Sequence, residues 1–384
     1  MTMSSPTSLT PAALLADVNR HRITLQATLA PLIGDRFQPA GFPEIGHVIY
    51  RAPRQDRTTE DVCIMDSAAS MANHLEAVCH ANPLTLELHN DIATLPHVQC
   101  WTGDGNLKEP KRLVVTSLSE GHRLASSHFV DEKAKLVVDG KASDESFIGR
   151  LLGAFGLQDL GTKTHPLPGD WGQVFNTIFR YDPNSLVHGI LFPSLGIKIP
   201  RVLTAHHEAF GAARVPSSGV KFDKLGKTTS GQPIFAVDEE TAREIRATFV
   251  LDLSLVRSFG RDDKVGLKER QKTFLLELAF WKIKQLLSAP FRFRSNCDLR
   301  LDVLSWIGGD ISDPKGPKDK GVELSELSTD IKKGIAKAFD EENEGVTKVY
   351  WPCEELFRPG RDTEENVPED TGGDAAGSDD PEAS

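Results

Sequence analysis

The sequence predicts an α+β fold built around a mostly antiparallel sheet. Apolar strands and amphipathic helices interleave along the chain, without the regular βαβ spacing of a doubly wound sheet. Long stretches that contain Gly and Pro separate these units, which indicates large insertions. A chain of 384 residues is long enough to bury a substantial core as one elaborated domain.

The N-terminal half is expected to alternate strands with short helices. Thr10 and Pro11 have the pattern of an N-cap and a first helical residue. Apolar residues at every second position predict a strand over 21–29. The remaining patterns predict strands at 62–65 and 112–118, helices at 12–19, 67–80, 144–155 and 171–180, and a loop at 36–46.

The C-terminal half is expected to hold the most apolar elements. These are strands at 186–192, 200–210, 247–256 and 291–303, helices at 268–287 and 324–339, and a Gly-, Ser- and Lys-rich loop or hairpin at 214–233. Residues 1–360 are therefore interpreted as one domain. Residues 361–384 contain nine acidic residues, one basic residue and almost no apolar ones, which predicts a disordered acidic tail.

The charge of the chain is unevenly distributed. The formal net charge is −11, but residues 180–300 contain 20 basic and 13 acidic residues. Such a basic middle can form a phosphate-binding surface, although a merely solvated face is the simpler alternative. No apolar run approaches membrane-spanning length, the N-terminus lacks a signal-peptide pattern, and the five cysteines form no C-x-x-C. We therefore expect a cytoplasmic protein with reduced thiols and no membrane partner.

Motifs for catalysis and for metal or cofactor binding do not emerge. Gly226-Lys227-Thr228 suggests a phosphate-binding loop, but Lys221 stands where that loop needs glycine. His206 and His207 are adjacent on a predicted strand, so they point to opposite faces and cannot share a metal. No catalytic residue, metal or cofactor is expected.

Five segments together resemble one protein family. They are Arg36–Pro43 (RFQPAGFP), Asp66–Glu76 (DSAASMANHLE), Thr116–Arg123 (TSLSEGHR), Lys198–Leu203 (KIPRVL) and Phe291–Leu299 (FRFRSNCDL). Their order and spacing resemble the backbone subunit of the type I-G (also called I-U) CRISPR Cascade complex, in the Cas-seven superfamily. The resemblance covers residues 20 to 305. His74 stands where this family suggests Arg, and Gly121 where it suggests Pro.

The resemblance implies a fold and a function. The core would be an RRM-like (ferredoxin-like) palm with insertions that form fingers and a thumb. Copies of the chain would form a filament along a guide RNA in a ribonucleoprotein for antiviral defence, and would present the guide to target DNA. Other Cascade subunits and a recruited helicase-nuclease would be its partners, and the chain itself would not be an enzyme.

The candidate RNA-binding residues are small polar or basic side chains. Residues on the polar face of the 67–80 helix, and residues that follow the 112–118 strand, suit contacts to phosphate and sugar. Ser119 is expected to cap a helix whose first turn holds His122 and Arg123. The candidates are Ser67, Ser70, Asn73, His74, Ser117, His122, Arg123, Lys198, Arg201, Arg214, Lys221, Lys224 and Lys227.

Two other functions remain as alternatives. One is an RNA endonuclease in which His122 acts as a general base, although no partner carboxylate or nucleophile is evident. The other is a protein-interaction scaffold that does not depend on RNA. The first predicts RNA cleavage that is lost in His122→Ala, and the second predicts no effect of charge reversal at Arg123 and Lys198.

Overall fold

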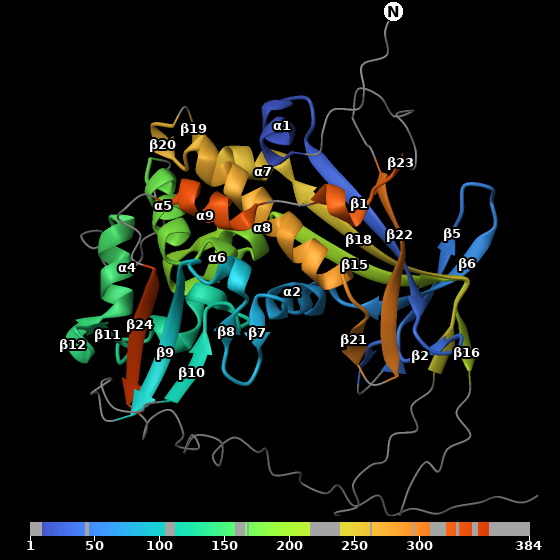
Figure 1. The fold of residues 1–384 in the computed structure, drawn as a ribbon, viewed down its shortest axis with the longest axis horizontal. Coiled ribbons are helices and arrows are strands. Elements are labelled where there is room, and N and C mark those ends of the chain that lie inside the picture. Colours follow the sequence, from blue (N-terminus) through green and yellow to red (C-terminus); the bar gives the residue numbers. More distant parts are fainter. Residues whose placement is uncertain are drawn as a thin grey trace, which may run out of the picture.

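A central antiparallel sheet organises the chain (Figure 1). The computed structural model describes residues 10–42, 46–103, 112–157, 166, 169–215, 239–261, 263–294, 296–307, 320–327, 330–339 and 345–352. The strand order of the large sheet is β21-β22-β1-β18-β15-β6-β5, and β23 pairs with β22 beside it. Its strands are β1 (Arg22–Pro31), β5 (Ile49–Pro53), β6 (Thr59–Asp66), β15 (Leu203–Phe210), β18 (Glu244–Asp252), β21 (Phe291–Arg294), β22 (Cys297–Ile307) and β23 (Lys320–Gly321).

Strand β1 shows why this sheet has one buried face. Ile23, Leu25 and Ala27 are at most 1% exposed, whereas the alternating Thr24 and Gln26 are partly exposed. Alternation with period two puts the apolar side chains against the helices and leaves a polar opposite face. The predicted strand over 21–29 and its buried set are confirmed.

Two helices connect the middle strands in a split pattern. Along the chain, α2 (Ala68–Ala77) lies between β1 and β15, and α8 (Glu269–Leu287) lies between β18 and β22. The middle of the sheet has the order β22-β1-β18-β15, with every pair antiparallel. Helices α2 and α8 contact each other against the sheet. This β-α-β-β-α-β connectivity brings the start of α2 close to strands that lie far from it in sequence.

A second sheet has five strands in the order β10-β9-β24-β11-β12. Its strands are β9 (His97–Gly103), β10 (Arg112–Thr116), β11 (Lys135–Val138), β12 (Lys141–Ser146) and β24 (Val346–Pro352). The late strand β24 occupies the centre, parallel to β9 and antiparallel to β11. Figure 1 shows this red strand beside the cyan β9.

Smaller elements complete the described fold. The short strands are β2 (Arg36–Phe37), β3 (Gly41–Phe42), β4 (Gly46–His47), β7 (His80–Asn82), β8 (Glu87–Leu88), β13 (Ile190–Phe192), β14 (Ile197–Ile199), β16 (Ala213–Val215), β17 (Glu239–Thr241), β19 (Gly260–Arg261) and β20 (Val265–Gly266). The α-helices are α1 (Pro11–Ala16), α3 (Ser127–Val130), α4 (Phe147–Phe155), α5 (Trp171–Tyr181), α6 (Pro183–His188), α7 (Leu253–Ser258) and α9 (Ile331–Ala338), and the 3-10 helices are Asn90–Ile92, Arg123–Ala125, Pro193–Leu195 and Leu324–Leu327. None of the helices in these described ranges is long and apolar enough to cross a bilayer.

Several sequence expectations need correction. Residues 186–188 belong to helix α6 rather than to a strand, because Asp182 caps the helix and Pro183 begins it. Residues 253–256 likewise form helix α7 and not the end of β18. The 36–46 segment contains three short strands rather than a plain loop. The predicted helices at 67–80, 171–180 and 268–287 are confirmed with small shifts of their ends, and the 361–384 tail lies outside the described residues.

Candidate nucleic-acid interface

Part of the polar face of α2 is directed inward. The helix begins at Ser67, whose Oγ accepts a hydrogen bond from the backbone N–H of Ser70 at 3.1 Å. Ser70 Oγ donates to Asp66 Oδ2 at 2.8 Å, and His74 Nε2 lies 3.1 Å from the same oxygen. Ser67 and Asn73 remain exposed. Of these four predicted residues, two are therefore free to meet a ligand, and two organise a buried carboxylate.

Sequence reasoning missed Asp66, the last residue of β6, which lies just before this helix. It is 4% exposed and forms an ion pair with Arg294 at 3.3 Å. Burial opposes its ionisation, but the hydrogen bonds from His74 and Ser70, together with the charges of Arg294 and His74, outweigh that effect, and the pKa of Asp66 lies below its ordinary value. The spacing of Asp66, Ser70 and His74 at i, i+4 and i+8 was the available signal.

A groove of about 340 Å³ brings together four other predicted residues. His122 and Arg123 come from the segment after β10, and Lys198 and Arg201 come from the β13–β14 hairpin region. The side chains of His122 and Lys198 are exposed. Among the described residues that line the groove there is no carboxylate, and the charged side chains there are basic. Such a surface suits an anion such as a phosphodiester.

Arg201 joins the groove to α2. Its Nη1 donates to the backbone carbonyl of Ala68 at 3.0 Å. Burial, and then the neighbouring charge of Arg123, lowers the pKa of Arg201. Arg201 therefore links the groove to the first turn of α2. The exposed Ser67, which caps that turn, lies in the neighbouring part of the structure.

Arg123 does not reach outward as a flexible phosphate contact. It is 7% exposed, and its Nε and Nη2 donate to the two carboxylate oxygens of Glu76 at 2.7 and 2.9 Å. Its Nη1 donates to the carbonyl of Gly189 at 3.1 Å. His122 and Arg123 also do not begin an α-helix capped by Ser119. Arg123 starts a short 3-10 helix, while Ser119 bonds back to Thr116. Arg123 therefore lines the groove from its buried side.

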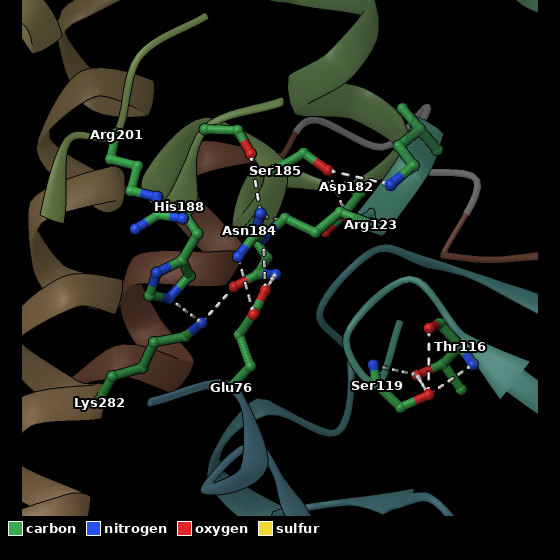
Figure 2. Close-up of polar contacts among 12 residues, drawn as sticks. Glu76, Thr116, Ser119, Arg123, Asp182, Asn184, Ser185, His188, Arg201 and Lys282 are labelled. Atoms are coloured by element: carbon green, nitrogen blue, oxygen red, sulfur yellow. Dashed lines mark hydrogen bonds and ion pairs between the residues drawn. The ribbon is translucent and has the colours of Figure 1, made fainter. Parts of the chain in front are cut away.

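Beneath the groove lies a buried polar network (Figure 2). Asn184 donates to Glu76 at 2.7 Å, and Lys282 donates to Asn184 and lies 3.0 Å from His188 Nε2. Burial, and then the charge of Lys282, holds the pKa of His188 well below its usual range. Lys282 follows the apolar run Leu278–Trp281 of α8, and a lysine at this place in the helix was the sequence signal of this network.

Asp182 forms the end of the network next to helix α6. Ser185 Oγ donates to its carboxylate at 2.7 Å, and the backbone N–H of Asn184 donates to it at 3.1 Å. Burial raises the pKa of Asp182 to about 7 in spite of the bond from Ser185. The side chains of this network are buried and joined by hydrogen bonds. They therefore hold the segments that form the groove in one geometry.

The other predicted site residues lie elsewhere. Ser117 is fully buried and accepts a hydrogen bond from the N–H of Val98 at 3.2 Å, so it joins β9 to the end of β10 and cannot reach a ligand. Arg214 lies on β16, with Nε 3.5 Å from the buried Glu240, and is not part of the groove lining. Lys221, Lys224 and Lys227, like the Gly226-Lys227-Thr228 segment, lie outside the described residues.

The two adjacent histidines of β15 are separated by the sheet, as predicted. His206 is exposed, whereas His207 is 1% exposed and neither of its ring nitrogens has a hydrogen-bond partner among the described residues. Burial lowers the pKa of His207 to about 3. Among the described residues, no three His, Cys, Asp or Glu side chains gather in a metal-binding arrangement.

Comparison with known proteins gives a match to a family model and likenesses of low sequence identity to solved structures. The family model described as CRISPR-associated protein GSU0053 matches residues 23–214. No curated protein matches the chain. One similar solved chain belongs to a "CRISPR RNA-guided surveillance complex, pre-nicking", with 10% identity, TM-score 0.33 and coverage of 75% of this chain and 77% of that chain. Another is Csc2 from Thermofilum pendens, with 12% identity, TM-score 0.32 and 82% coverage of both chains.

Proposed function

We propose a function from one premise: this chain belongs to the family of CRISPR-associated protein GSU0053. The proposed function is a guide-RNA-binding backbone subunit, of Cas-seven type, in a type I CRISPR surveillance complex. The finer assignment to subtype I-G rests on the five sequence segments quoted above. In this role the chain binds RNA and does not cleave it.

The cationic groove is the observation that carries this proposal. His122, Lys198 and Arg201 line it from segments that are distant in sequence, and its lining contains no carboxylate from the described part of the chain. A subunit that accepts any guide sequence has to contact phosphate and sugar and leave the base edges free for target DNA. Positive charge without acidic partners supports such contacts. The described lining residues also offer no carboxylate that could orient His122 as a general base.

The strand order supports a palm of RRM type. In that fold four antiparallel strands follow β-α-β-β-α-β connectivity, which the order β22-β1-β18-β15 with α2 and α8 reproduces. In the proposed assembly the segments between these strands serve as fingers and thumb. Several copies stack along one guide RNA with other Cascade subunits, and a separate helicase-nuclease cleaves the target.

Co-purification with RNA tests the proposal. The chain is expressed with a guide RNA and its partner subunits, purified and treated with nuclease. We expect protected RNA in a large multimer. The variant Lys198→Glu should lose much of that RNA, because it reverses an exposed charge of the groove. Arg123 is unsuitable for this test since its charge is paired in the interior.

Lys333→Glu provides the matched control. Lys333 is exposed on α9 and does not line the groove, so this variant should keep its RNA. RNA-free monomers from the wild-type chain would overturn the proposal and leave the scaffold alternative in its place. Degraded guide RNA that becomes intact in His122→Ala would favour the endonuclease instead.

A further inference from the structure

The cations at the edge of the groove have no acidic partners in the described part of the chain. Lys198 is exposed, and neither it nor Arg201 forms an ion pair with a described carboxylate. Other surface cations differ, because Arg51, Arg243 and Arg292 pair with carboxylates at 2.9, 2.7 and 2.9 Å. The groove therefore presents positive charge that the described residues do not balance, and it attracts a polyanion of any chemistry.

A dense run of negative charge belongs to the same chain. The acidic segment, residues 361–384, contains nine carboxylates and a single basic residue. Carboxylates that repeat along a backbone carry one negative charge each, as phosphodiesters do along a nucleic acid, and acidic runs of this kind often act as interaction segments. The nine are Asp362, Glu364, Glu365, Glu369, Asp370, Asp374, Asp379, Asp380 and Glu382.

The groove lies within reach of these carboxylates. Strand β24 ends at Pro352 beside Gly103, at the end of β9. The groove segment 121–123 follows β10, whose end at Thr116 lies opposite Gln99, near the start of β9. The length of β9, seven residues, therefore separates the end of β24 from the groove end of the sheet by ~20–25 Å. An extended chain covers ~33–36 Å in ten residues, which is the separation in sequence between Pro352 and the first of the nine carboxylates.

A tether strengthens a weak contact. Because the acidic segment belongs to the same chain as the groove, its effective concentration there is on the order of millimolar. A contact whose own dissociation constant is about a millimolar is therefore occupied about half of the time. In the proposed assembly a guide RNA displaces it, since one strand makes phosphate contacts along several subunits at once. A short RNA that meets a single groove lacks this advantage.

We propose that the acidic segment occupies the groove of its own chain, against Lys198 and Arg201, until RNA replaces it. The proposal rests on the proposed function and adds an intramolecular competitor to the same site. The competitor lowers the affinity of the free subunit for short RNA of any sequence. It thereby favours the guide, whose many contacts outweigh the competition.

Zero-length cross-linking tests the contact itself. A carbodiimide joins a lysine amine directly to a carboxylate that touches it, and mass spectrometry identifies the joined peptides. In the full chain without RNA, we expect Lys198 to be joined to the acidic segment several times more often than Lys333, which is exposed on α9 and does not line the groove. Single-stranded RNA should remove the Lys198 product. A mixture of unlabelled and isotope-labelled chains shows whether both peptides come from one chain.

Neutralising the acidic segment measures its effect on RNA binding. A variant in which all nine carboxylates are replaced by amides should bind a short labelled RNA about three- to tenfold more tightly than the wild type at low salt, and the gain should shrink as salt rises. Fluorescence anisotropy measures both affinities. In a Lys198→Gln background the gain should fall to less than half, whereas in a Lys333→Gln background it should persist. General repulsion between the segment and RNA does not depend on Lys198, so the comparison separates docking from repulsion.

The outcomes keep this proposal apart from the proposed function. A Lys198 product no more frequent than that of Lys333, or one that joins labelled to unlabelled chains as random mixing predicts, overturns the proposal. So does neutralisation without any gain, or with the same gain in all three backgrounds. A wild-type chain that still retains guide RNA in these cases leaves the proposed function standing. A chain whose Lys198 is joined to the acidic segment but which binds no RNA keeps the intramolecular contact and contradicts the proposed function.

Discussion

Arg123 and Glu76 form a two-point ion pair in the interior, with Nε and Nη2 donating to Oε1 and Oε2 at 2.7 and 2.9 Å. Both side chains are less than 10% exposed, and they lie 47 positions apart in sequence. Arg123 also adopts a left-handed backbone conformation, with φ of 55°. A non-glycine residue keeps such a conformation only when its surroundings fix it, and here the ion pair does so.

Glu76→Gln should strongly destabilise the protein. The amide keeps the shape of the side chain, but it leaves the buried guanidinium of Arg123 without a counter-charge. Breaking a buried pair in this way costs ~3–5 kcal/mol of unfolding free energy, and urea denaturation measures it. Glu145→Gln is the control, because Glu145 and Arg150 make the same two-point pair at the surface. There the expected loss is only ~0–1 kcal/mol, and equal losses in the two variants would refute the prediction.

Removing one groove cation should change the salt dependence of RNA binding. Lys198→Ala deletes an exposed charge that faces the groove. If Lys198 neutralises one phosphate, the slope of log K against log salt should become less steep by ~0.7, the value for single strands. Fluorescence anisotropy with a labelled RNA at several salt concentrations gives this slope. An unchanged slope would show that Lys198 meets no phosphate.

Replacing His207 should reduce sensitivity to acid. The folded state keeps this ring neutral, since burial lowers the pKa of His207 to about 3, whereas the unfolded chain accepts a proton below ~6.5. Stability is therefore lost as pH falls from about 6.5 towards 3. At pH 5 this linkage costs the wild type ~2 kcal/mol relative to neutral pH, and His207→Leu should remove that cost.

The measured quantity is the difference in unfolding free energy between the wild type and His207→Leu at each pH. Burial raises the pKa of Asp182 to about 7, which gives the opposite slope between pH 4 and 7. That contribution is common to both proteins and cancels in the difference. His207→Leu should also raise stability at neutral pH, because two unpartnered ring nitrogens disappear from the interior. Parallel stability curves for the two proteins would refute the prediction.

Gly189→Ala should distort the groove from its base. Gly189 has φ of +78°, and a Cβ there would lie 2.9 Å from the carbonyl oxygen of Ile199 and 3.1 Å from the backbone nitrogen of Arg201. We expect ~1–3 kcal/mol of destabilisation and weaker RNA binding. Gly169→Ala is the control, since its added Cβ has open space and Gly169 does not line the groove. Similar effects of the two substitutions would contradict this explanation.

Local patterns predicted the elements that alternate or are amphipathic. Strand β1 and helix α8 were identified because their apolar residues recur with the period of the element. Helix α6 was misread as part of a strand, since all six of its residues are buried and no periodicity remains. Its polar residues Asn184 and Ser185 are satisfied by partners that only the folded chain brings close.

The candidate site was predicted in part. His122, Lys198 and Arg201 were identified from motif resemblance, and the structure brings them to one groove. The burial of Arg123 and Ser117 could not be predicted, because their partners Glu76 and Val98 lie in other segments. A sequence shows which residues carry charge, but the direction of a side chain depends on contacts between distant segments.

The central position of β24 has a consequence for biosynthesis. Strands β9 to β12 end at Ser146, and their middle neighbour begins only at Val346, about 200 residues later. At ~5–20 residues per second, the ribosome needs on the order of 10–40 s to supply it. Throughout that interval the nascent chain carries two unpaired strand edges, on β9 and β11, that can pair with other chains. The second sheet therefore closes only after β24 has been synthesised, and until then a nascent chain on a crowded polysome is exposed to aggregation through these edges.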